Sequence, residues 1–217
     1  MRSEDAQPKP STPQVGQPIA EDLPAIEFVP LGRFSVHNPQ AVPSSRQVLE
    51  PAPFIIGQQS ETQHFNNQCD ARAHALALLQ QARHSLCIYS ADLEPWLYHH
   101  SSIQAACTAF LLASPRNQLR ILLRDTSRAT KDGHRLVTLA RKLSSNCHIR
   151  KLHLDYPSEE INFLVADKCA LLVRPEPSEY AGYVCYKNPT SARLRQVQFE
   201  QAWSTSISDA DLRSFLL

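Results

Sequence analysis

Polar side chains that could bind or transform a ligand follow two of the predicted strands of this 217-residue chain. Asp92 comes just after the apolar run 86–89, Arg124 and Asp125 come directly after the run 119–123, and His134 lies near the start of a helical pattern. Because the carboxyl ends of parallel strands meet at one edge of a sheet, we expect these four residues on a common rim. Carboxylate and imidazole groups suit acid–base chemistry, and arginine suits phosphate binding.

Two hypotheses about this rim stay open. One is a site for a small or phosphate-bearing ligand at Asp92, Arg124, Asp125 and His134. The other is an enzyme that works through Asp92, Asp125 and His134. The structural alternative is that the two aspartates cap turns, the arginine pairs with one of them, and the histidine makes a structural hydrogen bond.

A basic band covers residues 116–151, with ten lysines and arginines against only Asp125 and Asp132. Such a band can bind nucleic-acid phosphates. Its sequence contains no aromatic residue for base stacking, and its arginines span a strand and a loop rather than one helical face. Solvent-exposed helix faces are therefore the preferred interpretation, with nucleic-acid binding as an alternative.

The elements that position these residues alternate between helix and strand. Helical spacing of apolar residues covers 71–84, with Asp70 as the expected N-cap, and recurs at 102–112, 131–143 and 191–204. Between the first three helices and after them lie the strand-like runs 86–89, 119–123 and 148–152. Three further runs, 162–165, 170–173 and 182–186, are separated by turn-length gaps. This order predicts an α/β domain with a mixed, mostly parallel sheet flanked by helices and an antiparallel extension.

The hairpin at 158–173 carries Glu160, Asn162 and Asp167 between and beside its two strands. Their spacing resembles that of H-x-K-x-x-x-x-D, the signature of the phospholipase D-like superfamily. The chain from about Asp70 to Ser206 is similar to a single phospholipase D-like half-domain. The phrases at 89–98, 121–126 and 132–137 resemble the domain of uncharacterised bacterial proteins that occurs alone or fused behind GNAT acetyltransferases.

The resemblance implies a degenerate active site. Catalytic members attack a phosphodiester with the motif histidine, use the lysine to stabilise phosphate charge, and normally combine two motifs. Here Glu160 stands at the histidine position and Asn162 at the lysine position, so both the nucleophile and the cation are replaced. No second copy of the motif appears in the sequence. We therefore expect a binding or interaction module without phosphodiesterase activity, and possible homodimers, because single-motif members often join two half-sites.

The composition of the chain predicts its domain boundaries and its location. Ten of sixteen prolines fall in residues 1–53, which predicts a disordered tail before a domain at 54–217. The start of the chain lacks an apolar signal region, and no run approaches the ~18 apolar residues that span a bilayer, so we expect a cytoplasmic protein.

The six cysteines are widely spaced and the five glycines are scattered. These patterns favour reduced core thiols, with disulfides or a metal site as the alternative, and they offer no glycine-rich turn for acetyl-CoA. We expect no cofactor and no metal. The expected partner is an unknown protein or a phosphate-bearing ligand.

Overall fold

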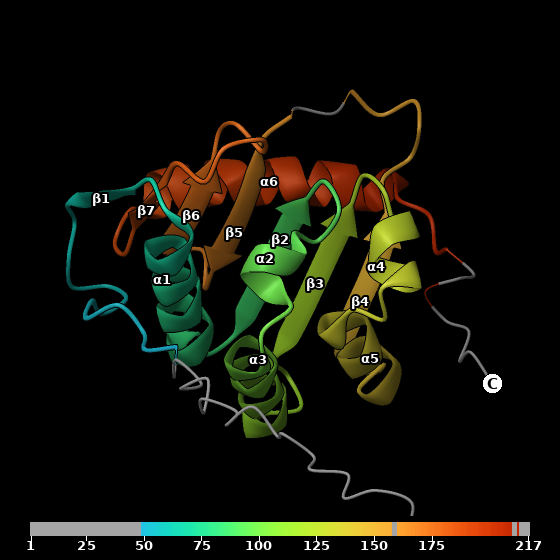
Figure 1. Cartoon of the computed structure of the whole chain (residues 1–217), viewed down its shortest axis with the longest axis horizontal. Coiled ribbons are helices and arrows are strands. Elements are labelled where there is room, and N and C mark those ends of the chain that lie inside the picture. The colour runs from blue at the N-terminus through green and yellow to red at the C-terminus, as the bar shows by residue number, and fades with distance from the viewer. Residues whose placement is uncertain (1–48, 158–159, 210–211, 213–217) are drawn as a thin grey trace, which may run out of the picture. The chain divides into compact units, whose positions relative to one another are not determined.

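The computed structural model describes residues 49–157, 160–209 and 212. Its strands form one seven-stranded sheet in the order β1-β7-β6-β5-β2-β3-β4 (Figure 1). The strands are β1 (Thr62–Phe65), β2 (Ser85–Ser90), β3 (Gln118–Leu123), β4 (Cys147–Lys151), β5 (Asn162–Ala166), β6 (Ala170–Arg174) and β7 (Gly182–Cys185). The helices are α1 (Gln68–Gln81), α2 (Pro95–Tyr98), α3 (Ser101–Ala113), α4 (Ser127–Lys131), α5 (Arg135–Lys142) and α6 (Pro189–Thr205).

The mixed α/β sheet flanked by helices is confirmed, but the expectation of mostly parallel pairing is wrong. Only β2 with β3 and β3 with β4 are parallel. The pairings of β2 with β5, β5 with β6, β6 with β7 and β7 with β1 are antiparallel. The reason is that the predicted antiparallel extension is longer than the parallel part and joins it directly at β2.

Helices cover both faces of the sheet. In Figure 1, α1, α3 and α5 lie on the near face and α6 crosses the far face. Side chains alternate along the central strands: Leu164 and Ala166 of β5 join the core under α1 and α3, whereas Phe163 and Val165 join the core under α6. Coverage of both faces explains why β5 and β6 read as continuous apolar runs rather than as alternating patterns.

Two predicted helix boundaries are corrected. Helix α1 begins earlier than expected, because Asn67 rather than Asp70 is its N-cap: the Asn67 side chain accepts a hydrogen bond from the Asp70 amide. The helix expected over 131–143 is shorter and corresponds to α5, whereas α4, which ends at Lys131, is not predicted. The chain between them passes through Gly133 in the left-handed region at φ +59°, which interrupts the helix.

The start of the described chain packs on α1. The Ala52 amide donates to the Ala73 carbonyl at 3.0 Å, and Leu49 and Ala52 contact the core. The predicted disordered tail, residues 1–53, otherwise lies outside the described residues. No described helix is both long enough and apolar enough to cross a membrane.

Candidate functional site

The three motif positions of the β5–β6 hairpin lie at two opposite ends of it. Asn162 is the first residue of β5, Glu160 is an exposed residue just before it, and Asp167 lies in the turn after Ala166. Five residues of extended chain span roughly 16 Å, so Asp167 cannot act on a group held by Asn162.

Asp167 has a structural role. Its carboxylate accepts hydrogen bonds from the amides of Arg83, His84 and Ser85 at 2.7, 2.8 and 2.9 Å. These amides belong to the segment that connects α1 to β2. Asp167 and Lys168 both have positive φ, 51° and 55°, as a type I′ hairpin turn requires. The aspartate therefore ties the hairpin turn to the start of the central strand.

Asn162 is the motif residue that faces a possible ligand site. It is 2% exposed, and its Oδ1 accepts from the Ala91 amide at 3.1 Å and from Arg124 Nη2 at 3.2 Å. These two donors fix the orientation of the side-chain amide, and its Nδ2 atom is buried. Within the described chain, Nδ2 has no hydrogen-bond partner. A buried amide without a partner costs free energy, so Nδ2 marks a place for an acceptor.

A pocket of about 360 Å³ adjoins this amide, and we refer to it as the Asn162 pocket. Its described walls come from the loop after β2, from α2, from Arg128 of α4 and from the β6–β7 loop. Its lining residues are Ala91, Asp92, Glu94, Trp96, Arg128, Asn162, Pro177, Ser178 and Tyr180. The Trp96 and Tyr180 rings meet edge to face with centroids 4.9 Å apart, which joins α2 to the β6–β7 loop.

Arg174 holds the walls of the Asn162 pocket together. It lies opposite Asn162 in the β5–β6 register and is only 1% exposed. Its guanidinium forms an ion pair with Glu94, which is itself 5% exposed. It also donates to the carbonyls of Pro177 and Glu179 and lies over the Trp96 ring at 4.7 Å. Burial lowers the pKa of Arg174, with the charge of Asp92 opposing that shift.

The loop between β2 and α2 has an unusual backbone. Leu93 and Glu94 are consecutive non-glycine residues with positive φ, 65° and 33°, and both are buried. Such conformations cost free energy and persist where the surrounding structure imposes them. Here the Ser90 hydroxyl accepts from the Leu93 amide at 3.2 Å, and Asp92 accepts from the Glu94 amide at 3.0 Å. The loop thereby directs the Glu94 carboxylate toward Arg174.

Of the four rim residues expected from the sequence, two lie at or beside the Asn162 pocket and two do not. Asp92 lines the Asn162 pocket and forms an ion pair with Arg128 at 2.8 Å, and Arg124 contacts Asn162. Asp125 instead closes its own turn, accepting from the Ser127 amide and hydroxyl at 3.0 and 2.8 Å. Both bonds lower the pKa of the Asp125 carboxyl, and the bond from the Ser127 amide has the larger effect.

His134 lies buried beneath the helices. It is 1% exposed, and its Nδ1 accepts from the Leu136 amide at 3.1 Å, which caps α5. Its ring meets His99 edge to face with centroids 5.0 Å apart. Across the described ranges, no hydrogen bond or ion pair joins Asp92, Asp125 and His134 to one another. The described residues thus show no direct contact among the three residues of the alternative enzyme hypothesis, which stays a prediction.

The burial of His134 predicts a pH-dependent stability. Burial, assisted by the nearby His99 and Arg135 and opposed by Asp92, lowers its pKa from 6.5 to about 4. As the pH falls from 6.5 toward 4, the unfolded chain binds a proton that the folded chain does not, so stability is lost in that window. We expect a loss of about 3 kcal/mol across it. His134→Asn keeps a capping acceptor but does not titrate, so urea unfolding of this variant should show a smaller loss between pH 6.5 and 4. Equal losses in both proteins would contradict this role.

The basic band is divided between the two faces of the sheet. Arg120 forms an ion pair with Glu200 of α6 at 2.5 Å, and Arg150 lies over Trp203 at 4.7 Å. Arg124 and Arg128 instead reach the Asn162 pocket. The band therefore does not form one continuous basic surface, although folding places the α6 aromatic Trp203 beside two of its arginines.

Sequence reasoning missed Glu94, Trp96, Arg174 and Tyr180. They lie on loops and at a strand end that approach one another because β6 pairs antiparallel with β5 and β7 pairs antiparallel with β6. One signal was available in the sequence: Asn162 and Arg174 each lie six residues from Lys168, so a hairpin register centred on Lys168 pairs them, as in the structure.

Comparisons with known proteins agree with this fold. A crystal structure of Nuc, a phospholipase D family member from Salmonella typhimurium, superposes with a TM-score of 0.51 and 15% identity, covering 68% of this chain and 96% of that one. NucT from Helicobacter pylori superposes with a TM-score of 0.51 and 12% identity, covering 69% and 99%. A search of the curated proteins found no match. The chain thus has a phospholipase D-like fold.

The family comparison covers most of the folded part of the chain. Residues 67–215 match a family whose description is "Domain of unknown function (DUF7931)". This match begins at the N-cap of α1 and contains the Asn162 pocket and, apart from Phe65, the buried residues of both cores. The chain is therefore a member of the DUF7931 family, built on a phospholipase D-like fold.

Proposed function

We propose that this protein is a phospholipase D-like binding module that holds a ligand in the Asn162 pocket without cleaving phosphodiesters. The observation that carries the proposal is the Asn162 side chain. It occupies the lysine position of the motif, its orientation is fixed by two donors, and its Nδ2 is buried beside a pocket without a partner in the described chain.

The residues at the motif positions argue against phosphodiester cleavage. An exposed carboxylate at Glu160 repels a phosphodiester and is a far weaker nucleophile than imidazole toward phosphorus. Asn162 supplies a hydrogen bond but no positive charge to stabilise the transition state. Asp167, the one motif residue that matches, is occupied by three backbone amides.

A phosphate-bearing ligand fits the donors of the pocket best. Arg128 and Asn162 both line the pocket and carry N–H donors, and Arg124 donates to Asn162. The two carboxylates in the wall are each compensated, Asp92 by Arg128 and Glu94 by Arg174. The pocket thus combines a charge-assisted donor with a fixed neutral donor, an arrangement that recognises anionic oxygen atoms.

Substitutions in the pocket test this proposal. Titration of the protein with phenyl phosphate, followed by NMR, should shift the Asn162 side-chain amide. Asn162→Leu removes the donor with little change in volume, so we expect affinity to fall about 10-fold or more, since a hydrogen bond to a charged group contributes ~1.5–3 kcal/mol. Arg128→Gln should weaken binding similarly.

Arg116→Gln is the matched control, because Arg116 is an exposed arginine of the same basic band. It should leave the affinity unchanged. Equal weakening by the Arg116 and Arg128 substitutions, or an unchanged affinity in Asn162→Leu, would contradict binding in this pocket.

Several expectations from the sequence stay predictions beside this proposal. They are the cytoplasmic location, the bacterial origin, homodimer formation and the relation to domains fused behind GNAT acetyltransferases. Nucleic-acid binding through residues 116–151 is the less favoured alternative, because the basic side chains of the band contact both faces of the sheet. Duplex DNA binding that falls steeply with salt would revive it.

A further inference from the structure

The free edge of β4 lies beside a pocket that the proposed ligand site does not use. β4 is the last strand in the sheet order, and among the described residues only Ile207 forms a β-bridge with its outer side. A pocket of about 530 Å³ lies there, within the size range of ligand sites. Its described lining comes from α5 and the following turn (Ala140, Arg141, Ser144), from β4 (Cys147, His148, Ile149, Arg150) and from the later chain (Ser208, Leu212). We refer to it as the β4-edge pocket.

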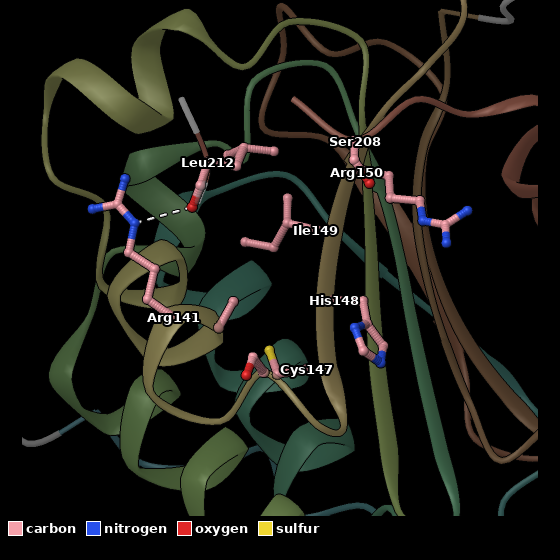
Figure 2. Close-up of a pocket in the computed structure, with 9 residues that line it drawn as sticks. Arg141, Cys147, His148, Ile149, Arg150, Ser208 and Leu212 are labelled. Carbon is pink, nitrogen blue, oxygen red and sulfur yellow. Dashed lines mark hydrogen bonds between the residues drawn. The ribbon is translucent and has the colours of Figure 1, made fainter. Parts of the chain in front are cut away.

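The lining shows that the pocket follows the edge of β4 rather than one of its faces. Figure 2 shows Ile149 directed toward the α5 side and Arg150 toward the opposite side. Consecutive side chains of a strand point to opposite faces, so a space touched by both must run along the strand edge. This is the position that an additional strand would occupy.

The backbone of β4 has groups available for such a strand. Lys151 exchanges two hydrogen bonds of 2.9 Å with Ile207, so its N–H and C=O point away from β3. Because this direction alternates along a strand, the N–H and C=O of Ile149 also point outward. Neither group has a hydrogen-bond partner among residues 49–157, 160–209 and 212. Among the described residues, Ile207 forms the one bridge to this edge of β4, and the Asp209 carboxylate accepts from the Thr126 hydroxyl.

The charged residues of the β4-edge pocket indicate which kind of strand the edge would bind. The described lining contains Arg141, His148 and Arg150 and no acidic residue, and Lys151 follows directly. A second copy pairing antiparallel through the same edge would place these basic residues opposite one another, which is unfavourable. Nucleic acid would gain from the charge, but it would leave the outward N–H and C=O of Ile149 without the paired partners that a peptide backbone offers.

We propose that the β4 edge binds an extended acidic segment of a partner protein by β-strand addition. The segment pairs with Cys147–Arg150, a length of roughly 13 Å, through backbone hydrogen bonds to Ile149. Its side chains alternate between the two sides of the edge. Apolar residues lie on the side of Ile149 and Ala140, and acidic residues lie on the side of His148 and Arg150.

A designed peptide tests this inference. Fluorescein-labelled Val-Glu-Val-Glu-Val-Glu, acetylated and amidated, should bind the full chain in an anisotropy titration. The same peptide with lysine in place of glutamate should bind at least 10-fold more weakly. On binding the glutamate peptide, the Ile149 amide should exchange with solvent at least 10-fold more slowly, as measured by NMR.

Charge reversal locates the binding. His148→Glu/Arg150→Glu should weaken binding of the glutamate peptide at least 10-fold. Arg116→Glu/Lys131→Glu, which adds at least as much negative charge on exposed residues elsewhere, should change it less than 2-fold. If the first double variant does not fold, the affinity of the glutamate peptide for Arg150→Gln replaces it. The slower exchange of the Ile149 amide in the wild-type chain then locates the binding independently.

Four outcomes would overturn the inference. They are the absence of binding, equal binding of the lysine peptide, equal weakening by both double variants, and binding that leaves the Ile149 amide unprotected. Self-association that protects Ile149 without any peptide would identify a second copy as the occupant. Displacement of the peptide by duplex DNA at the same residues would identify nucleic acid.

Discussion

Replacing Arg174 with methionine is expected to lower the free energy of unfolding by about 3–5 kcal/mol. The substitution keeps much of the side-chain volume but leaves the Glu94 carboxylate buried without its cation, and removal of one member of a buried ion pair has a cost of this size. It also removes the donor to the carbonyls of Pro177 and Glu179. Urea denaturation followed by circular dichroism measures the change.

The double variant Glu94→Gln/Arg174→Met separates the buried charge from the other contacts. Because glutamine is neutral, the double variant should unfold at a higher urea concentration than Arg174→Met alone. A loss below 1 kcal/mol in the single variant, or a double variant that is less stable than the single one, would show that Arg174 does not hold these loops.

Replacing Asp167 with alanine should cost about 2–4 kcal/mol of unfolding free energy. Three backbone amides lose a charged acceptor, and each such bond is worth ~1.5–3 kcal/mol when buried, less where water can replace it. Alanine also tolerates the positive φ of this position less well than aspartate. Asp167→Asn keeps one acceptor oxygen and the backbone preference, so it should lose less.

Glu160→Ala is the control for the Asp167 series, because Glu160 is an exposed motif residue with no role in that turn. It should change the free energy of unfolding by less than about 0.5 kcal/mol. Thermal or urea unfolding of the three variants tests the difference. If Asp167→Ala were as stable as Glu160→Ala, the carboxylate would be free for another role and the structural account of the motif aspartate would be wrong.

The sequence predicted the long apolar elements of the fold but not the short polar ones. The strands of both cores were predictable because runs such as 162–165 and 170–173 are apolar throughout. β1 was not predicted, because Thr-Gln-His-Phe is a mostly polar edge strand. α2 was not predicted either, because four residues are too few to show helical periodicity. The order of helices and strands predicted a mixed sheet with an antiparallel extension, but it did not show that most of the pairings are antiparallel.

The candidate site was predictable only in part. The motif spacing singled out Asn162, and the strand-end rule singled out Asp92 and Arg124, which lie beside it. The same rule also singled out Asp125 and His134, but short-range bonds decide their positions: Asp125 binds Ser127, and His134 caps α5. Arg174 was hidden because an arginine at the end of an apolar strand normally indicates the surface, whereas here the ion pair with Glu94 keeps it buried.

Asp167, the position that matches the resembled motif, has a role in the fold. Its carboxylate connects the hairpin turn to the start of β2. This connection does not depend on the residue types at Glu160 and Asn162, so it is compatible with the central claim of the proposed function, that the pocket binds a ligand without cleaving phosphodiesters.

One measurement tests that central claim most directly: a 31P NMR titration of bis(4-nitrophenyl) phosphate, an activated phosphodiester, with the full chain. We expect its resonance to broaden or shift on binding, to do so much less with Asn162→Leu, and to show no product resonance on prolonged incubation. A product resonance that forms with the wild-type chain and disappears with Glu160→Ala or Asn162→Leu would contradict the account, because the motif positions would then carry out phosphodiester cleavage.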